Sequence, residues 1–455
     1  MNFKEQKRQY IDDEGFRLLA LIEDKILQPV NKSPKRTPSG SIHEKIALDL
    51  TEKMVDSPHI ESAYDRTGHE YKKEVYNNRS IGFNGLDYLR VKKLAATASE
   101  EKSIVYKISE DFIENKIFKW LVKTHKENRA EKTLSTFLLD EFLMVCKNRR
   151  IRFPIVNLDI DNAFEIGKAK FDFFTEDYFN KLKQHNAEQG STSNEDSYSH
   201  IRNKYQGKVF VSFDVVAEVQ KAEEIALEYC SLTVDILKMC SDMLDLPDLG
   251  LKFDIDSRVK FASQSEVILT MAENELEEFT INMYGPQGRY RIGKKQWTQM
   301  LKRGLAVFHI FLINLTDEPT ELQSLIVNSI KRFGNAISIH SLHQRIVELF
   351  TILESLLLLN TNSPIIESVC RYCSKLVFKK IEDRKQAIEL LKIMYDVRSK
   401  LIHHGKEVRF DMDNLRKLQY IVVMLLEALI NKTKQHLSKQ SLLQEIEDAI
   451  MQAYD

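Results

Sequence analysis

The feature that most constrains this chain is the uniform helical pattern that runs from Thr316 to its end. Apolar residues recur there every three to four positions, and the breaks between the patterned segments are short. The segments expected to be helical are 320–334, 340–359, 364–380, 383–404, 413–436 and 438–452. Long helices joined by short connections form bundles, and only 15 Gly and 9 Pro interrupt the 455 residues. We therefore predict an all-α helical bundle over residues 316–455.

The preceding residues, 1–315, carry a mixed pattern. Helical periodicity marks 15–28, 43–56, 102–125, 131–147 and 218–244. Alternating apolar residues predict strands at 152–161, 164–173 (with Gly167 at a bulge) and 209–215, and short strands across 252–292 with a turn at 285–288. Residues 184–204 are polar and predict a linker or mobile loop. The expected fold class is α+β and mostly α, with a mixed region before the bundle.

Charge and cysteine content narrow the class of protein. The formal net charge is −1, which argues against wholesale wrapping of a polyanion. Five cysteines are few and odd in number, as in proteins of a reducing cytoplasm. No apolar run is long enough to span a bilayer, and the N-terminal MNFKEQKRQYIDDEG lacks the apolar core of a secretory signal. We expect a cytoplasmic protein that does not enter a membrane.

One helix of the predicted bundle carries residues with catalytic chemistry. Asp383 is a candidate N-cap, and Gly405 is a candidate left-handed residue after the helix. The apolar stripe of this helix comprises Ala387, Leu390, Leu391, Met394, Leu401 and Ile402. Arg398 falls inside the stripe, where its guanidinium must find a partner or line a groove. His403 and His404 close the helix.

Arg398 and His403 form the candidate catalytic pair. Histidine titrates near neutral pH and acts as base or acid, and the planar guanidinium suits phosphate, so the pair could cleave RNA without a metal. The spacing also occurs by chance, as a surface arginine followed by a histidine that meets the helix dipole. Five residues at 100° each place the two side chains about 140° apart on one helix. A distorted helix end or a second chain would have to bring them together; His404 also fits the spacing.

The sequence around this helix resembles the Apea-like branch of the HEPN superfamily. The resemblance covers residues 318–430. The residues that carry it are Phe333-Gly334 at a helix end, Arg345 and Leu353-Glu354-Ser355-Leu356 on the next helix, and Tyr395 followed by Arg398-Ser399-Lys400-Leu401-Ile402-His403.

This resemblance implies an all-helical domain that dimerises, with the Arg-x4–6-His motifs of two copies forming a metal-independent ribonuclease site. Arg398 and His403 would be catalytic, supported by Ser399, His404 and Glu354. No cofactor or metal would be needed. RNA and a second copy of the chain are the implied partners.

The resemblance also implies a biological setting. Many members act in antiviral defence or as toxins, which suggests residues 1–315 as a sensing or regulatory region and an inhibitor or trigger protein as a further partner. A tyrosine two residues beyond the histidine, through which some members are silenced, is replaced here by Gly405. That mode of control is therefore not expected.

Two other functions stay open on the sequence. A HEPN-like dimer could hold RNA or a protein without cutting anything. Asp159, Asp161 and Glu165 follow a predicted strand and could bind magnesium as a metal-dependent nuclease. Between Arg371 and Lys417, 13 Lys and Arg stand against 7 Asp and Glu, which fits either an RNA-binding surface or a solvated helix face.

Three further motifs have simpler structural explanations. The segment GRYRIGKK, residues 288–295, is close to a phosphate-binding loop but has Lys295 in place of the magnesium-binding Ser or Thr, so a hairpin turn is expected. Cys370 and Cys373 lack a second ligand pair and are expected in a helical core. His340 and His343 are one turn apart and are expected to be satisfied or exposed rather than metal ligands.

Overall fold

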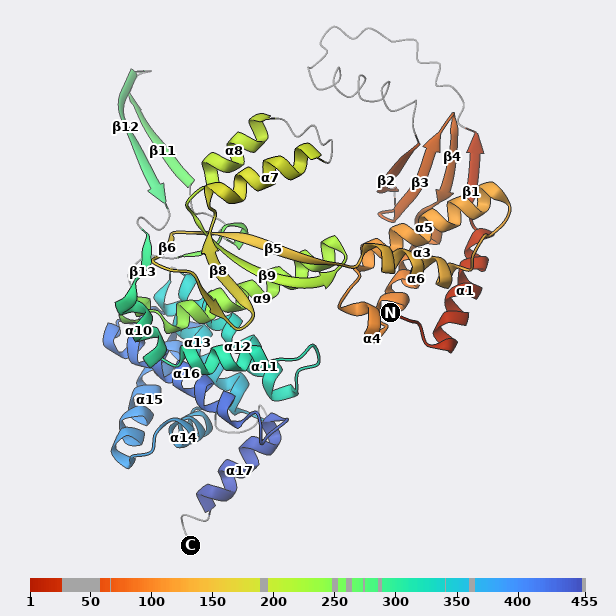
Figure 1. Cartoon of the computed structure of the whole chain (residues 1–455). Helices are drawn as coiled ribbons and strands as arrows, with labels where there is room; N and C mark the ends of the chain where they lie inside the picture. Colours follow the sequence, from red (N-terminus) through yellow and green to blue (C-terminus); the bar gives the residue numbers. More distant parts are fainter. Residues whose placement is uncertain are drawn as a thin grey trace. The chain divides into compact units, whose positions relative to one another are not determined.

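The computed structural model describes residues 1–26, 58–65, 67–188, 195–247, 253–258, 264–272, 275–284, 289–339, 341–359 and 365–451. The chain divides into two compact units (Figure 1). The smaller unit comprises Met1–Arg149 and Val215–Ile225, and the larger comprises Arg150–Asp214 and Ala226–Asp455. The boundary predicted at residue 315 is not one of these dividing points, because the core of the larger unit continues from its sheet into the C-terminal helices.

The smaller unit packs helices against an antiparallel sheet. The strands are β1 (Glu23–Ile26), β2 (His59–Tyr64), β3 (Glu70–Tyr76) and β4 (Arg79–Phe83), in the order β1-β4-β3-β2. The helices are α1 (Glu5–Leu19), α3 (Gly85–Ser99), α4 (Lys102–Val105), α5 (Glu110–Glu127) and α6 (Leu134–Val145). Asn84 caps α3 and Ser109 caps α5 through their side chains. The helix predicted over 15–28 ends at Leu19, because 23–26 pairs with β4 instead.

The larger unit is built on a five-stranded sheet of order β10-β5-β9-β8-β7. Its strands are β5 (Lys147–Val156), β7 (Phe164–Ile166), β8 (Ala169–Phe173), β9 (Val209–Ala217) and β10 (Asp254–Ile255). The single strand predicted over 164–173 is a hairpin, since Gly167 adopts a left-handed backbone (φ 59°) and reverses the chain there. β6 (Leu158–Ile160) pairs in parallel with β13 (Tyr290–Ile292), and β11 (Gln264–Ala272) pairs with β12 (Glu275–Tyr284).

The segment 184–204, predicted as a linker or loop, is helical in its described part. It completes α7 (Glu176–Glu188) and supplies most of α8 (Glu195–Tyr205), while 189–194 lies outside the described residues. The reason is local burial: Tyr198 and Tyr205 pack against a small aromatic core of Phe174, Phe179 and Phe210. A few aromatic side chains are enough to order a segment that is otherwise polar.

The C-terminal helices confirm the predicted mostly helical character of the chain. After α9 (Val219–Cys240) and the short 3-10 helices η1 (Asp242–Asp245) and η2 (Asp256–Arg258), the chain returns to helix at residue 294. These helices are α10 (Lys294–Lys302), α11 (Leu305–Asn314), α12 (Glu321–Ser338), α13 (Leu342–Leu357), α14 (Ile365–Val377), α15 (Ile381–His404), α16 (Met412–Lys432) and α17 (Lys439–Met451). Thr320 and Gln323 form a capping box at the start of α12.

The expected architecture, a mixed N-terminal region followed by a helical C-terminal region, is therefore present. Helices α13 and α16 contact each other and both α12 and α14, and α15 packs on α13, α14 and α16. The helix predicted at 43–56, the turn at 285–288 and His340 lie outside the described residues. Among the described helices, none has the length and apolar character needed to cross a membrane.

Candidate functional site

Helix α15 carries the predicted site and is regular to its end. Its N-cap is Lys380 rather than the predicted Asp383, which lies in the first turn together with Glu382, where carboxylates favour the helix dipole. Gly405 is left-handed (φ 61°), as predicted from its position. The amide of Lys406 donates to the carbonyl of Lys400 at 3.2 Å, which closes the helix end. The helix is thus not distorted between Arg398 and His404.

Arg398 lies between α15 and α13 with its side chain only 16% exposed. Its Nη2 donates to Oε2 of Glu354 on α13 at 3.5 Å and lies 3.3 Å from Oε1 as an ion pair without hydrogen-bond geometry. The guanidinium stands over the ring of Tyr395 at 5.3 Å. Tyr395 is itself held edge-on by Phe350. The Nε of Arg398 and the Oε1 of Glu354 are buried and have no hydrogen-bond partner among the described residues. The guanidinium is therefore positioned while part of its bonding capacity is unused.

His403 and His404 are both exposed at the end of α15. Because the helix is regular, His403 stays about 140° around the axis from Arg398, on the same side as Lys385 and Lys392. Neither histidine has a hydrogen bond or ion pair with any residue that the structure describes. Within one chain, Arg398 meets its predicted supporting residue Glu354 but does not meet the predicted catalytic histidine.

The remaining supporting residue, Ser399, is half-buried next to Arg398. Its neighbour Lys400 pairs with Asp396 at 2.6 Å on the surface of α15. Ser399 lies about 40° from His403 around the helix, so the hydroxyl is on the histidine side rather than the arginine side. The residues of the predicted motif thus divide between two faces of one helix.

Two of the three carboxylates considered for a magnesium site, Asp159 and Asp161, are engaged with arginines, and Glu165 lies on β7. Asp159 pairs with Arg289 at 3.3 Å and Asp161 with Arg291 at 2.9 Å. Among the described residues there is no cluster of three or more His, Cys, Asp or Glu side chains placed to hold a metal ion. The geometry gives this alternative no support.

Residues 289–295, the described part of the segment that resembles a phosphate-binding loop, form neither a hairpin turn nor such a loop. Residues Tyr290–Ile292 form a strand in parallel register with β6, Gly293 follows, and α10 begins at Lys294. A phosphate-binding loop needs these residues to curl around the anion, and a paired strand cannot. Gly288 lies outside the described residues.

Cys370 and Cys373 are buried core residues, as predicted. Burial raises the pKa of the Cys370 thiol to about 11 and raises that of Cys373 as well, so both are protonated at neutral pH. His343 is satisfied by the carbonyl of Val408 at 2.8 Å and packs against Phe410. Neither motif is part of a reactive site.

The sequence did not point to a buried charge cluster in the larger unit. Lys238 on α9 lies 2.6 Å from Asp254 and 3.5 Å from Asp235, and Arg258 lies 3.0 Å from Asp235. Burial raises the pKa of the Asp235 carboxyl, and the two cations oppose that shift. The only sequence signal was two charges, Asp235 and Lys238, inside an otherwise apolar stretch of helix.

Arg345, one of the residues behind the family resemblance, is also buried, with 3% of its surface exposed. It donates to the carbonyls of Pro247, Ile337 and Ile339 rather than to a carboxylate. Burial lowers its pKa to about 10. Its contacts close the end of α12, so its role in this chain is to hold helices together.

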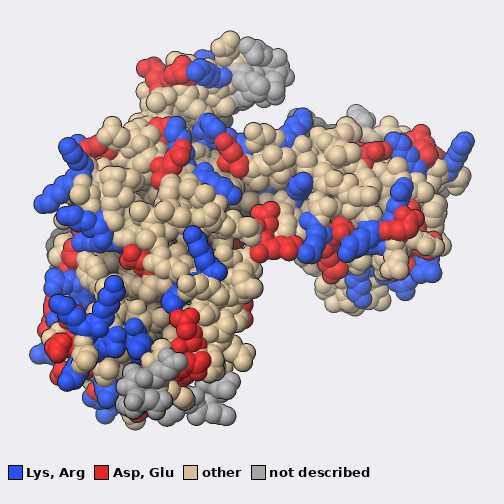
Figure 2. Space-filling model, turned by 60° about the horizontal axis from the view of Figure 1, so that its bottom comes forward, with Lys and Arg blue, Asp and Glu red and all other residues tan. Residues whose placement is uncertain are grey.

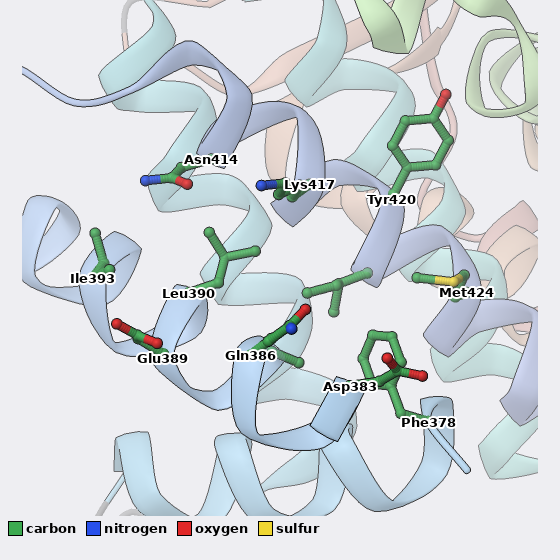
Figure 3. Close-up of a pocket in the computed structure, with 12 residues that line it drawn as sticks. Phe378, Asp383, Gln386, Glu389, Leu390, Ile393, Asn414, Lys417, Tyr420 and Met424 are labelled. Atoms are coloured by element: carbon green, nitrogen blue, oxygen red, sulfur yellow. The ribbon is translucent and has the colours of Figure 1, made fainter. Parts of the chain in front are cut away.

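A cavity of about 510 Å³ lies between the first half of α15 and α16 (Figure 3). Its apolar part includes Ala387, Leu390 and Ile421, and polar side chains reach it from both helices. One side of the cavity is formed by α15, the helix that also carries Arg398 and His403. Comparison of the chain with protein-family models, curated proteins and solved structures finds no match.

Proposed function

We propose that this protein is a metal-independent endoribonuclease whose active site forms between two copies of the chain. The observation that carries the proposal is Arg398, a guanidinium held by Glu354 and Tyr395 with its Nε left without a partner among the described residues. An arginine fixed in this way suits the non-bridging oxygens of a scissile phosphate. The resemblance to HEPN ribonucleases supplies the second half of the argument.

The second copy is needed because of the helix geometry. Arg398 and His403 are about 140° apart on a regular helix, so one chain does not bring them together. His403 is exposed, which leaves it available to the Arg398 of a partner subunit. A homodimer with composite sites satisfies both facts.

In this mechanism His403 acts as base or acid on the ribose 2′-hydroxyl or the leaving 5′-oxygen. The 2′-oxygen attacks phosphorus and the bond to the 5′-oxygen breaks, which yields a 2′,3′-cyclic phosphate and a 5′-hydroxyl. Arg398 stabilises the charge on the phosphorane, Glu354 orients Arg398, and Ser399 and His404 support the site. No metal or cofactor takes part.

Charge near the motif supports RNA as the substrate. Six exposed cations form no ion pair with any described residue: Lys379, Lys380, Lys385, Lys392, Lys406 and Arg409. Figure 2 brings the bottom of the molecule forward and shows Lys and Arg gathered at its lower left. Cations that are not neutralised by neighbouring carboxylates favour contact with a phosphate backbone.

The test is cleavage of labelled single-stranded RNA by the purified full-length protein in EDTA. Arg398→Ala and His403→Ala are each expected to lower the rate by at least a hundredfold while the fold and the dimer persist. Arg129→Ala and His200→Ala, which remove exposed side chains of the same types elsewhere, serve as matched controls and should keep full activity.

Mixing the two inactive variants tests the composite site directly. A mixed dimer of Arg398→Ala and His403→Ala chains retains one site with both groups, so activity should return. Two inactive variants that stay inactive when mixed, with exchange of subunits verified, would contradict a site shared between chains.

The alternative is a HEPN-like dimer that binds RNA or protein without cleavage. The separation of Arg398 from His403 within one chain favours this alternative. RNA binding without cleavage, unchanged in either variant, would establish it. In both cases the proposed setting is cytoplasmic antiviral defence or toxin activity, with residues 1–315 responding to a trigger or inhibitor protein.

A further inference from the structure

Strand β2 (His59–Tyr64) forms one edge of the four-stranded sheet in the smaller unit (Figure 1). It pairs with β3 on one side, and no described strand pairs with its other side. An edge strand presents a row of unpaired N–H and C=O groups to any strand that approaches it. Ile60 is 44% exposed and Tyr64 is 73% exposed, so these side chains are not covered either. The edge is therefore open to a further strand.

The opposite edge of the same sheet is protected. Strand β1 has only four residues, and three of them are charged: Glu23, Asp24 and Lys25. Asp24 also pairs with Arg79 of β4 at 2.5 Å. Short strands and charged side chains are the means by which proteins block sheet edges. In β2 the only carboxylate is that of Glu61, which accepts a hydrogen bond from the Tyr71 hydroxyl at 2.7 Å. The sheet thus blocks one edge and leaves the other open.

The exposed apolar residues of β2 lie on the face of the sheet that the helices cover. Ser62 is opposite Lys72 of β3, and Lys72 reaches Glu114 of α5 at 3.3 Å, which identifies that face. Ile60 and Tyr64 are two residues to either side of Ser62 and share its face. A strand from another molecule would therefore continue both the sheet and its apolar layer.

The sequence of β2 suits antiparallel pairing with itself. If the helices of both copies are to stay on the same side of the joined sheet, a single residue must lie on the two-fold axis. Two such registers keep five of the six residues of β2 paired. The register centred on Glu61 places two carboxylates directly opposite each other, which is destabilising. The register centred on Ser62 places Ile60 of each copy opposite Tyr64 of the other and Glu61 opposite Ala63, with no like charges in contact.

We propose that β2 pairs antiparallel with β2 of a second copy of the chain, with Ser62 on the two-fold axis. The two strand edges supply backbone hydrogen bonds, and the two contacts between Ile60 and Tyr64 fix the register. A contact of this symmetric kind closes on itself and gives a dimer. The proposed ribonuclease also needs a second copy, but strand pairing uses neither Arg398 nor His403 and does not depend on that function.

The first experiment is oxidative cross-linking of the full-length protein with a cysteine placed on the axis. Directly opposite Cα atoms of antiparallel strands are about 4.5–5.5 Å apart, within the span of a disulfide. Ser62→Cys should therefore give a dimer on a non-reducing gel that disappears with reductant. Glu61→Cys is the matched control, because its distance to the same residue of the other copy is about 8 Å, too long for a disulfide. It should cross-link no more than the unaltered protein.

The second experiment exchanges charges across the axis, with the rate of Ser62→Cys cross-linking as the readout. Ile60→Glu or Tyr64→Lys removes both apolar contacts and should lower that rate about two- to thirtyfold. The two substitutions together place each carboxylate opposite an ammonium of the other copy and should restore the rate. Leu86→Glu, which alters an exposed apolar residue of α3, should leave the rate unchanged. Circular dichroism checks that each variant is folded.

Each outcome bears on strand pairing separately from RNA cleavage. A dimer linked through Glu61→Cys but not through Ser62→Cys, or a charge-exchanged protein as slow as the single variants, would overturn the proposed register. No cross-link at either position would overturn strand pairing even in a protein that cleaves RNA. Cross-linking through Ser62→Cys in a protein that cuts no RNA would support strand pairing and contradict only the ribonuclease proposal.

Discussion

The larger unit contains two separate sites where oppositely charged side chains are partly or fully buried. The two sites differ in exposure and in how many partners each cation has. Lys238 is 1% exposed and contacts two carboxylates, Asp235 and Asp254, which Arg258 contacts from the other side. Arg398 is 16% exposed and has a single carboxylate, that of Glu354. The first region neutralises its charges completely, and the second leaves a buried guanidinium nitrogen without a partner among the described residues.

The difference separates a structural role from a candidate functional one. A network of two acids and two bases joins α9, β10 and η2, and further hydrogen bonds, such as that from Arg258 to the carbonyl of Ser231 at 3.2 Å, use its remaining donors within the fold. A half-buried pair with unused bonding capacity is what a phosphate ligand requires. An unpaired guanidinium nitrogen alone does not identify a site either, because the Nε of the buried Arg345 also lacks a partner among the described residues. Arg398 differs from Arg345 in being partly exposed and in pairing with a carboxylate.

Breaking the buried network should give the largest effect on stability. Lys238→Met keeps the length of the side chain but leaves Asp235 and Asp254 with Arg258 alone. Removing one partner of a buried ion pair costs about 3–5 kcal/mol in the free energy of unfolding. Urea denaturation monitored by circular dichroism measures it, with Lys331→Met as control, because the pair of Lys331 with Glu228 is exposed and worth no more than about 1 kcal/mol.

The stability cost of Lys238→Met should also depend on pH. Burial already raises the pKa of Asp235, and losing Lys238 removes a cation that opposes the shift. An acid whose pKa is raised by folding loses stability as pH rises through and above its unfolded value, about 3.9. The cost of Lys238→Met should therefore be smaller at pH 4.5 than at pH 7. An equal cost at both values would show that the carboxylates do not carry the effect.

Gly334 allows α12 to approach this network, and replacing it should give the second largest effect. A Cβ at this position would lie 2.2 Å from Cγ of Asp235. Alanine favours helix by about 1 kcal/mol over glycine, but forcing apart packed groups costs about 1–3 kcal/mol. We expect Gly334→Ala to lower the free energy of unfolding, measured in the same denaturation assay. A gain in stability would mean that the contact with Asp235 relaxes freely.

These two sites also show which structural features could be predicted from the sequence. The position of Arg398 at the edge of the core and the left-handed Gly405 follow from helical spacing and glycine chemistry, which are local properties. The buried network could not be predicted, because Asp254 and Arg258 reach α9 from a distant segment through the fold. The helix α8 was missed because the burial of Tyr198 depends on phenylalanines from other elements.

The candidate site around Arg398 and His403 was predictable only in part, because only its local properties follow from the sequence. The residue types of the motif are local, and so is the angle between Arg398 and His403 on a regular helix. The family resemblance named Glu354 only as a supporting residue, and its contact with Arg398 depends on how α13 packs against α15. The cavity beside α15 depends on how α16 packs against it, and nothing in the sequence of either helix specifies its volume.

The smallest expected effect on stability comes from the pair of Arg398 with Glu354. This prediction tests most directly whether that pair is functional or structural. Glu354→Gln keeps the shape and one acceptor for Arg398 but removes the charge, so the free energy of unfolding should fall by only about 1 kcal/mol. If Glu354 orients a catalytic arginine, the single-turnover rate of RNA cleavage should fall at least tenfold while RNA affinity changes little. Asp396→Asn, which neutralises the exposed partner of Lys400, should change neither quantity. A Glu354→Gln protein that loses stability and keeps its cleavage rate would place this pair with the buried network, as a structural contact.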